Sequence, residues 1–538
     1  RPRIGGFRGR LARTAVGAEQ SSGAAGHKLR LPSAQVCHTR LVVTNLADIV
    51  RESAARRPAH IAVVDGDNTI TYAGLDDQIT AMASGLLSHG VKPGDRVALL
   101  LGNRITFVVA LYGVMRAGAV AVPLNTSSTP HEIEYAVSLT GAKAVICDGS
   151  TNDSVRSADL GPCVGIMAGA TQWDALLSRP DPSLLPTETD PETVAVLLFT
   201  SGSTGKPKAA MLTHRALLAN LDALLALDAP AAITDTDRAL AVLPLFHVYS
   251  LNAVLSLTLA AGGTVVLSDR FSAHGTLELI ERHHVTVVAG APPMYVAWSA
   301  DPQLRRAVAS VRLLTSGAAP LPPALFDQVR TVTGQPVWEG YGLTECSPVV
   351  STSLVPGVPK AGSVGMALPN LEVRIGSGPD APADGEEDDE TGEIWVRGPS
   401  VFSGYWPDGA GGPDESGWFP TGDMGYFDHE GYLHLVDRRS DLILVSGFNV
   451  YPREVEDVIT LHEGVGEVAV TGVDHPYSGE AVKASVVLVP GAVVTPDDIV
   501  TWCEQRLARY KCPTIVEVVD TLPHAVTGKL ARAKLRDG

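Results

Sequence analysis

The stretch Thr200-Ser-Gly-Ser-Thr-Gly-Lys-Pro-Lys208 directly follows an apolar run, Val194-Ala-Val-Leu-Leu-Phe199. The run is typical of a buried strand, and Ala209-Ala-Met-Leu-Thr213 predicts a second strand after the stretch. Glycines let the backbone turn tightly and bring its N–H groups close to a bound anion. Hydroxyls donate hydrogen bonds, and lysines add positive charge. We therefore interpret the stretch as a loop that cradles a polyphosphate.

This loop differs from a Walker A motif. That motif needs a glycine five positions before the Gly-Lys pair and a Ser or Thr after the lysine. Here Thr200 stands in place of the glycine, and Pro207 follows Lys206. A cluster of Gly, Ser and Thr also fits an ordinary solvated turn, so the interpretation depends on landmarks elsewhere in the chain.

Length and composition narrow the class of protein. The 538 residues are too many for one compact core, so we expect two or more domains. The net charge of −17 argues against a nucleic-acid partner. The longest apolar stretch, 105–124, contains Arg116, so no transmembrane segment is expected. Six cysteines without a C-x-x-C pair favour a reducing, cytoplasmic setting over a disulfide framework or a zinc site.

Residues 1–42 differ in charge from the rest of the chain. They hold eight Lys or Arg and the single acid Glu19, a balance of +7, which leaves −24 for residues 43–538. The segment is rich in Gly, Ala and Ser and lacks sustained apolar periodicity, so we expect a disordered basic extension. An Arg-rich, acid-poor start also occurs in organelle transit peptides, but the amphipathic helix of such peptides is not evident here.

From Val43 onward, apolar runs typical of strands alternate with helical patterns, which indicates an α/β domain. One strand ends at Pro244 and places His247 and Tyr249 just past its C-terminal end, where open α/β sheets bind ligands. A lone histidine is more often a structural residue. The small apolar residues of Gly290-Ala-Pro-Pro-Met-Tyr295 fit either a pocket wall or ordinary core.

Two later stretches carry groups suited to a nucleotide. In Trp338-Glu-Gly-Tyr-Gly-Leu-Thr-Glu345, Tyr341 offers an aromatic face, Thr344 a hydroxyl and Glu345 a hard carboxylate of the kind that Mg²⁺ prefers. In Thr421-Gly-Asp423 the carboxylate can accept hydrogen bonds from two neighbouring hydroxyls.

Together these landmarks closely resemble the AMP-forming adenylating superfamily, which contains acyl-CoA synthetases, luciferases and peptide-synthetase adenylation domains. The matching segments occur in the family's order, and the resemblance covers residues 43–538. They are the phosphate loop at 200–208, the Tyr-Gly-x-Thr-Glu core at 341–345, the triplet at 421–423, the segment 437–456 and Thr-Gly-Lys at 527–529.

The resemblance implies a fold. It consists of an α/β large N-terminal domain over residues 43–436, with two α/β subdomains plus a small β-barrel, and a small mobile α+β C-terminal domain over residues 441–538. Residues 437–440 would form the hinge. The hinge position usually carries Asp or Lys in this family, and Ser440 occupies it here, which leaves the electrostatics of the hinge in doubt.

The resemblance also implies roles for matched residues. The residues expected to bind ATP or AMP are Thr200, Ser201, Gly202, Ser203, Thr204, Gly205, Lys206, Lys208, Gly317, Ala318, Ala319, Gly340, Tyr341, Gly342, Asp423 and Arg438. The residues expected at the acyl and CoA end are His247, Tyr249, Gly290 and Gly447. The expected catalytic residues are Lys529, Thr344, Glu345 and His247, with Glu345 as the Mg²⁺ ligand.

The implied activity is that of an ATP-dependent acyl-CoA synthetase. A carboxylate attacks the α-phosphate of Mg-ATP to give an acyl-adenylate and pyrophosphate, and the CoA thiolate then displaces AMP. Lys529 and Gly447 belong to opposite faces of the small domain in this family, which implies a rotation about Ser440 between the half-reactions. An aryl-CoA ligase of 4-coumarate type, an acyl-AMP ligase feeding a carrier protein and a non-catalytic nucleotide-binding relative are the alternatives.

The substrate is expected to be an apolar carboxylic acid. Segment 243–252 resembles the acyl-pocket entrance of fatty-acyl and 4-coumaroyl CoA ligases and holds no acid to pair an α-ammonium. Small residues at 290–291 and 318–319 leave room for a chain, so a medium- or long-chain fatty acid is favoured over an arylate. The expected partners are this acid, ATP and CoA; peripheral membrane contact and a homodimer are both left open.

Overall fold

The computed structural model describes residues 41–178, 180–200, 207–376, 391–438, 441–445, 448–475, 479–524, 530 and 532–536. Most of the expected basic extension, 1–42, therefore lies outside the described residues. So do Ser440, Gly447 and Lys529, together with residues 201–206 of the phosphate loop.

A six-stranded sheet carries the strands on either side of the phosphate loop. Its order is β6-β5-β3-β4-β7-β8, parallel except for the β7–β8 pair. Thr200 and Lys208 are register partners at the end of that pair, so both predicted strands exist and their ends meet. The strands are β3 (Arg96–Leu100), β4 (Val120–Pro123), β5 (Ala144–Cys147), β6 (Val164–Met167), β7 (Val194–Thr200) and β8 (Lys208–Thr213).

A nine-stranded sheet carries most of the other expected site residues. Its order is β15-β14-β13-β12-β11-β9-β10-β1-β2, with antiparallel pairs only towards its two edges. The strands are β1 (Ile61–Asp65), β2 (Asn68–Thr71), β9 (Arg238–Ala241), β10 (Thr264–Leu267), β11 (Val287–Gly290), β12 (Leu313–Ser316), β13 (Val337–Gly342), β14 (Val349–Thr352) and β15 (Met366–Ala367).

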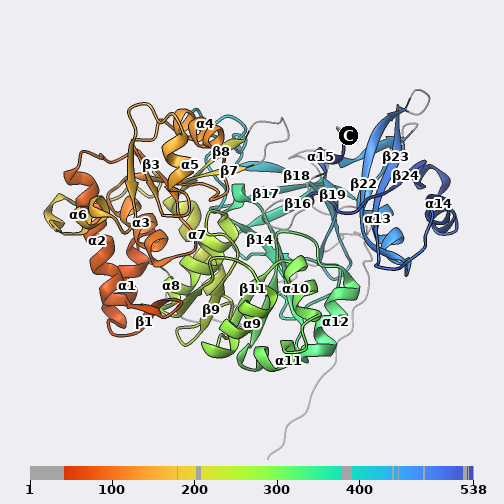
Figure 1. Cartoon of the computed structure of the whole chain (residues 1–538), viewed down its shortest axis with the longest axis horizontal. Coiled ribbons are helices and arrows are strands. Elements are labelled where there is room, and N and C mark those ends of the chain that lie inside the picture. The colour runs from red at the N-terminus through yellow and green to blue at the C-terminus, as the bar shows by residue number, and fades with distance from the viewer. Residues whose placement is uncertain are drawn as a thin grey trace, which may run out of the picture. The chain divides into compact units, whose positions relative to one another are not determined.

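Helices cover both faces of this sheet, and its central strands are therefore buried on both sides. One face packs on α9 (Ala273–Arg282), α10 (Pro292–Ser299), α11 (Leu304–Ala307) and α12 (Pro323–Thr333), which gather around β9 and β11 (Figure 1). The other face packs into a larger core with α1 (Asp48–Arg56), α2 (Tyr72–Ser88), α3 (Ile105–Arg116), α7 (His214–Leu225), the π-helix η2 (Tyr249–Ser256) and α8 (Leu257–Ala261).

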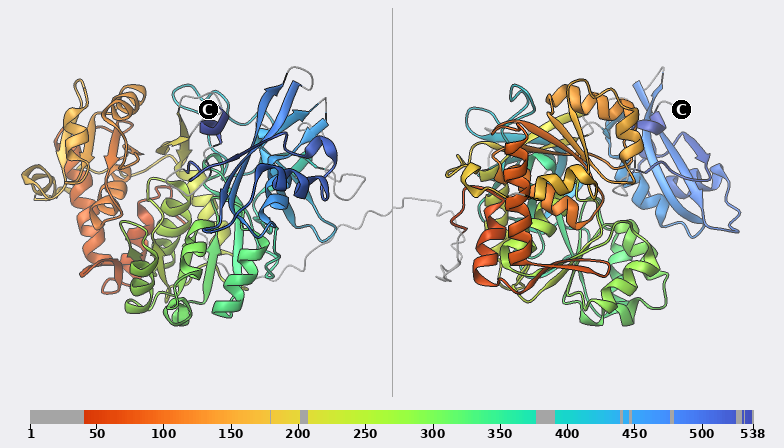
Figure 2. Two further views of the ribbon diagram at one scale, coloured as in Figure 1. Left: turned by 45° about the vertical axis from the view of Figure 1, so that its right-hand side comes forward. Right: turned by 60° about the vertical axis from the view of Figure 1, so that its left-hand side comes forward.

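The first helices lie side by side, drawn in red and orange in Figure 2. On the other face of the six-stranded sheet lie α4 (Pro130–Thr140) and α5 (Asn152–Ser157). Helix α4 starts at a capping box between Thr129 and Glu132 and ends at Gly141, whose φ of +61° suits glycine. The remaining short elements of this region are α6 (Thr171–Leu177), η1 (Pro182–Leu184), η3 (Val308–Ser310) and η4 (Thr344–Cys346).

A four-stranded antiparallel sheet stands where the resemblance implies a small barrel. Its order is β16-β17-β18-β19, and its long third strand carries Thr421 and Asp423. The strands are β16 (Glu372–Gly376), β17 (Gly392–Arg397), β18 (Trp418–Phe427) and β19 (Leu433–Arg438).

The C-terminal residues form a smaller α+β unit with its own core. Its sheet order is β21-β20-β23-β22, with β24 beside β23. The elements are β20 (Ile443–Val445), β21 (Phe448–Val450), α13 (Pro452–Thr460), β22 (Val465–His475), β23 (Gly479–Leu488), α14 (Pro496–Glu504), η6 (Arg509–Lys511), β24 (Ile515–Val518) and α15 (Ala533–Arg536). A large α/β domain followed by a small α+β domain confirms the predicted fold class. Over the described residues, no helix is long and apolar enough to cross a membrane.

Candidate active site

A cavity of about 920 Å³ lies where β7, β12 and β13 end, with β18 closing one side. Its lining changes character from one end to the other. The polar end is lined by Thr200, Lys208, Thr344, Glu345, Tyr405, Thr421 and Asp423. The apolar arm is lined by Leu224, Ala232, Ile233, Ala239, Val254, Leu257, Val287, Ala289, Leu313 and Leu354.

Most of the expected site residues that the structure describes meet around this one cavity. Those that line it are Thr200, Lys208, His247, Tyr249, Gly317, Ala318, Gly340, Tyr341, Gly342, Thr344, Glu345 and Asp423. Ala319 and Gly290 are not among the lining residues. Arg438 ends β19, where its backbone pairs with that of Asp423.

The turn after β12 brings backbone close to an aromatic ring. A Cβ added to Gly317 would lie 3.2 Å from Cε1 of Tyr249, so glycine permits this approach. The next residue, Ala318, has a φ of +67°, which is uncommon for alanine. The turn thus lines the cavity with residues that have little or no side chain.

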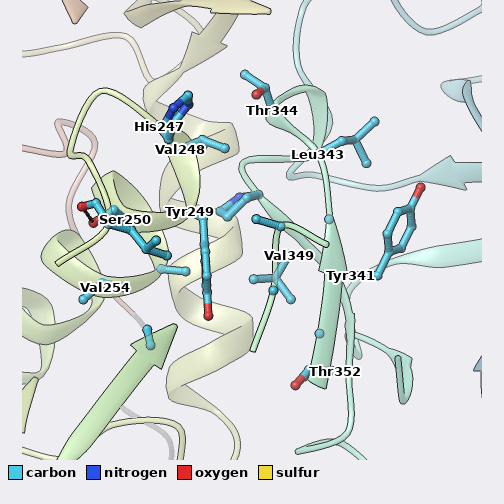
Figure 3. Close-up of a pocket in the computed structure, with 18 of the residues that line it drawn as sticks. His247, Val248, Tyr249, Ser250, Val254, Tyr341, Leu343, Thr344, Val349 and Thr352 are labelled. Carbon is cyan, nitrogen blue, oxygen red and sulfur yellow. Dashed lines mark hydrogen bonds between the residues drawn. The ribbon is translucent and has the colours of Figure 1, made fainter. Parts of the chain in front are cut away.

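Tyr341 is held by Asp423, 82 residues further along the chain. Its hydroxyl donates to Oδ2 of Asp423 over 2.7 Å. Burial, and then the negative charge of Asp423, raise the pKa of Tyr341 well above its ordinary value, so the phenol keeps its proton. The backbone N–H of Asp423 donates to Oγ1 of Thr421 over 3.2 Å. Tyr341 points away from Tyr249 (Figure 3), and its hydroxyl is engaged by Asp423.

Glu345 is a buried carboxylate, 9% exposed, on the short turn η4. Its Oε1 accepts a hydrogen bond from the hydroxyl of Tyr405 over 2.6 Å. Among the described residues, no Lys, Arg or His lies within ion-pair distance of it. A buried charge without a cation is costly, and an oxygen donor of this kind fits Mg²⁺.

The donor set around Glu345 is small. The described part of the chain holds no group of three or more His, Cys, Asp or Glu that could bind a metal. Mg²⁺ bound with a nucleotide needs only one or two carboxylates, because phosphates and water supply its other ligands. Glu345 therefore fits an ion that arrives with ATP, which when bound would neutralise phosphate charge.

Tyr405 is a site residue that the sequence reasoning missed. It lies in the connection between β17 and β18, its hydroxyl contacts Glu345, and Nζ of Lys208 lies 5.2 Å from the centre of its ring. The available signal was the aromatic cluster Phe402-Ser-Gly-Tyr-Trp406 in a chain with only 5% aromatics. Aromatic residues grouped in a loop suggest a binding role.

The wall opposite the sheet is a π-helix, η2 (Tyr249–Ser256), in which the N–H of Leu257 bonds to the carbonyl of Asn252, five residues back. Such helices are rare and are found frequently at functional sites. Their wide turn directs Tyr249, Ala253 and Val254 to the cavity. The Tyr249 hydroxyl lies 3.1 Å from Oγ1 of Thr315 on β12, and Tyr249 and Val349 lie next to each other in Figure 3.

His247 lies at the same end of the cavity as Thr344 (Figure 3). Burial lowers its pKa to about 4, so the imidazole is neutral near pH 7. A neutral ring offers one N–H donor and one acceptor nitrogen. His247 is therefore suited to orienting a substrate by hydrogen bonds and carries no charge to offset that of a phosphate.

Gly290 does not occupy the position expected of it. A Cβ added there would lie 3.0 Å from the ring of Tyr295 and 3.4 Å from that of Trp298, on the face of the sheet that packs against α10. Its neighbour Ala289 lines the apolar arm instead. Neighbouring residues of a strand face opposite sides, and a strand buried on both faces gives no alternation from which to assign them.

Asn103 fixes the segment that leads into His247. It is 5% exposed, and its Nδ2 donates to the carbonyls of Ala241, Leu243 and Ser268 at 3.0–3.2 Å. Its Oδ1 accepts the N–H of Leu245 over 3.0 Å. This single side chain joins the loop after β3 to the turn after β9.

Replacing Asn103 by leucine should leave those buried backbone groups without partners. Each orphaned group costs about 1–3 kcal/mol, so we expect a clear loss of unfolding free energy in urea titrations, with KM for the acid raised more than KM for ATP. Asn125, whose Oδ1 accepts the exposed N–H of Ser127, is the control. Asn125→Leu should leave the unfolding free energy and the two KM values nearly unchanged. Equal effects of the two substitutions would contradict this role.

Two family models of known proteins match this chain, one over the large domain and one over the C-terminal domain. The family model described as AMP-binding enzyme matches residues 50–406, and that described as AMP-binding enzyme C-terminal domain matches residues 454–529. The chain belongs to the AMP-binding enzyme family. The family match and the relatives of this chain show it to be an acid–thiol ligase, a CoA ligase of the AMP-forming kind.

Individual relatives of this family member act on different acids. The chain is 38% identical to a feruloyl-CoA synthase of Amycolatopsis sp, with 90% of this chain and 96% of that one covered. It is 34% identical to a long-chain-fatty-acid–CoA ligase of Bacillus subtilis (strain 168), with 95% of each covered. The ATP-bound crystal structure of MatB from Rhodopseudomonas palustris superposes with a TM-score of 0.85 at 31% identity, covering 92% of this chain and 98% of that one.

Proposed function

We propose that this CoA ligase acts on a carboxylic acid with an extended apolar tail, a medium- or long-chain fatty acid. The observation that carries the proposal is the apolar arm. Among the described lining residues, the charged ones are Lys208, Glu345, Glu393 and Asp423, and none of them belongs to the arm. A tail can be buried there without stranding a charge, whereas a charged tail would cost several kcal/mol.

The length of the arm suits a chain. It begins beside Ala289 and Thr315, which are register partners, and continues past Val287 and Ala239, also register partners, towards Ile233. The first pair lies two residues further along the strands than the second, a separation of about 7 Å. An extended backbone advances about 3.4 Å over three bonds, so this step corresponds to roughly six bonds of a tail.

The hydroxyls along the arm are mostly engaged within the protein. Thr258 donates to the carbonyl of Val254 over 2.7 Å, and Thr352 Oγ1 accepts the N–H of Leu354 over 3.3 Å. Among the described residues, the Tyr249–Thr315 pair keeps one hydroxyl hydrogen without an acceptor, because only one of the two hydroxyls donates to the other. The arm therefore offers little to a polar tail.

In the proposed reaction, the polar end binds ATP and the acid lies with its carboxylate near His247 and Thr344. Asp423, oriented by Tyr341, accepts hydrogen bonds from the ribose, and the turn at Gly317 receives adenine. Lys208 and the residues of the phosphate loop balance the phosphate charge as it develops. Attack of the carboxylate on the α-phosphate releases pyrophosphate, and the thiolate of CoA then displaces AMP. Lys529 and Gly447 are proposed to serve the first and second steps in turn.

Substitutions at two depths of the arm test the tail assignment. Ala289→Leu and Ala239→Leu should both shorten the longest accepted fatty acid. The first should do so by roughly six more carbons, because its side chain enters about 7 Å nearer the reacting end. Chain-length profiles of CoA-dependent AMP release, from hexanoate to stearate, measure this difference.

The two variants serve as controls for each other, since each adds the same atoms to the same arm. If both variants keep the wild-type chain-length profile, the tail does not occupy the arm. If the wild-type enzyme prefers ferulate, coumarate or benzoate over every fatty acid in the series, the fatty-acid assignment is wrong and the adenylation chemistry still stands.

A hydroxycinnamate is the second candidate substrate. The feruloyl-CoA synthase relative favours it, and so does the Tyr249–Thr315 pair, which is a single hydroxyl partner for a phenol. A site that depends on such a hydrogen bond rejects analogues without the hydroxyl by about 10⁴-fold or more. Ferulate preferred over cinnamate by such a factor would therefore identify this class.

A further inference from the structure

We infer that Tyr405 is a positioning residue. It fixes the Glu345 carboxylate relative to β8, the strand that follows the phosphate loop. The inference rests on the proposed function, in which Glu345 is the protein's ligand to the Mg²⁺ of ATP. Tyr405 itself touches neither the acid nor the nucleotide in this account. It acts by holding the Glu345 carboxylate and the Lys208 ammonium at a fixed separation.

The backbone around Tyr405 is anchored to the strand that leaves the phosphate loop. Tyr405 forms an isolated antiparallel bridge with Ala210 of β8. The N–H of Trp406 donates to the carbonyl of Ala209 over 2.8 Å, and the N–H of Met211 donates to the carbonyl of Gly404 over 3.0 Å. Segment 403–406 thus runs beside β8 and moves with it.

The same segment is also attached to Glu345. The N–H of Phe402 donates to the backbone carbonyl of Glu345 over 2.9 Å, and the hydroxyl of Tyr405 donates to its Oε1 over 2.6 Å. Hydrogen bonds from a hydroxyl to a carboxylate are short and strong. The ring of Phe402 meets that of Tyr405 edge-on at 5.1 Å between centroids, which restricts the rotation of the phenol.

The hydrogen bond distinguishes the two carboxylate oxygens of Glu345. Oε1 is occupied by Tyr405, and in the described part of the chain no hydrogen bond reaches Oε2. Lys208 places its ammonium 5.2 Å from the centre of the same ring, within the range of a cation–π contact. One ring thus locates a free carboxylate oxygen and a phosphate-binding cation.

Tyr405→Phe removes only the hydroxyl and keeps the ring beneath Lys208. The support that a ligating carboxylate receives from such a partner is typically worth 10- to 100-fold in metal affinity. Calorimetry gives the Kd for ATP with and without Mg²⁺, and the ratio of the two values is the Mg²⁺ effect. We expect this ratio to be about tenfold smaller in the variant than in the wild type. The Tyr405 hydroxyl also interacts with Thr200, so binding of metal-free ATP should weaken too, but by a smaller factor than this loss of the Mg²⁺ effect.

Tyr432 is a matched control. Its hydroxyl donates to the carbonyl of Val358 over 3.1 Å, and Nζ of Lys360 lies 5.0 Å from the centre of its ring. Tyr432→Phe loses the same atom from a similar cation-capped ring and should leave the Mg²⁺ effect on ATP binding unchanged. An equal change in both variants would mean a general loss of stability and would overturn the inference.

A double-mutant cycle separates this inference from the proposed function. If Tyr405 acts through Glu345, the effect of Tyr405→Phe on Mg²⁺-dependent ATP binding should largely disappear in a Glu345→Gln background. Full additivity, or a wild-type Mg²⁺ effect in Tyr405→Phe, would overturn the inference. Failure of the wild-type enzyme to form an acyl-adenylate from any acid would instead overturn the proposed function, since the calorimetric comparison needs no acid.

Discussion

A Lys529→Ala variant is expected to lose more than about 10²-fold in acyl-adenylate formation, the scale of one lost electrostatic contact in a transition state. The α-phosphorus is the atom attacked in that half-reaction, whereas the acyl carbon is attacked in the second, and the family resemblance implies that Lys529 faces the nucleotide only in the first. The variant should still convert supplied acyl-adenylate and CoA to thioester at the wild-type rate. Single-turnover assays of the two half-reactions measure the difference.

Lys534, five residues later and exposed, provides the control for charge at the end of the chain. Lys534→Ala should leave both half-reactions unchanged. If Lys529→Ala slows both half-reactions equally, the lysine does not alternate between two positions, and the proposed rotation of the small domain about Ser440 loses its support.

Glu345→Gln is expected to slow pyrophosphate release by about 10²-fold at a fixed Mg²⁺ concentration, because the metal contributes several kcal/mol of charge stabilisation. The amide keeps the shape of the side chain but removes its charge, so part of the rate should return as Mg²⁺ is raised. Titrating Mg²⁺ in an ATP–pyrophosphate exchange assay measures both effects.

Glu393 is the matched carboxylate: it is 8% exposed and lines the same cavity. Glu393→Gln should keep the wild-type dependence on Mg²⁺. If the two glutamate variants shift that dependence equally, or neither does, the ion is held elsewhere.

The strands around the phosphate loop could be predicted because most of their residues are apolar and the loop interrupts them abruptly. Thr200 and Lys208 bound that interruption, and they are register partners in the structure. The order of strands in the nine-stranded sheet could not be predicted from single runs. β10 and β1 are register neighbours about 200 residues apart, and nothing within either strand indicates its partner.

The site was predictable where a motif fixed several residues together and unpredictable where one residue acts alone. Tyr341, Glu345 and Asp423 belong to motifs and line the cavity. Tyr405 and Asn103 work through contacts with segments about 60 and 140 residues away, and such distances leave no local pattern. Gly290 was expected at the acyl end, but both faces of β11 are buried, so composition does not reveal which residue of this strand meets the cavity.

The apolar arm is bounded on one side by strand backbone and by side chains as small as Ala239 and Ala289. Changing one of these residues alters the space for a tail without moving the strands, and the residues of the polar end come from other elements. Selection can therefore retune the acid that is accepted while the ATP-binding end is left intact. After a gene duplication, a few substitutions in β9 and β11 would be enough to give one copy of the ligase a different substrate specificity.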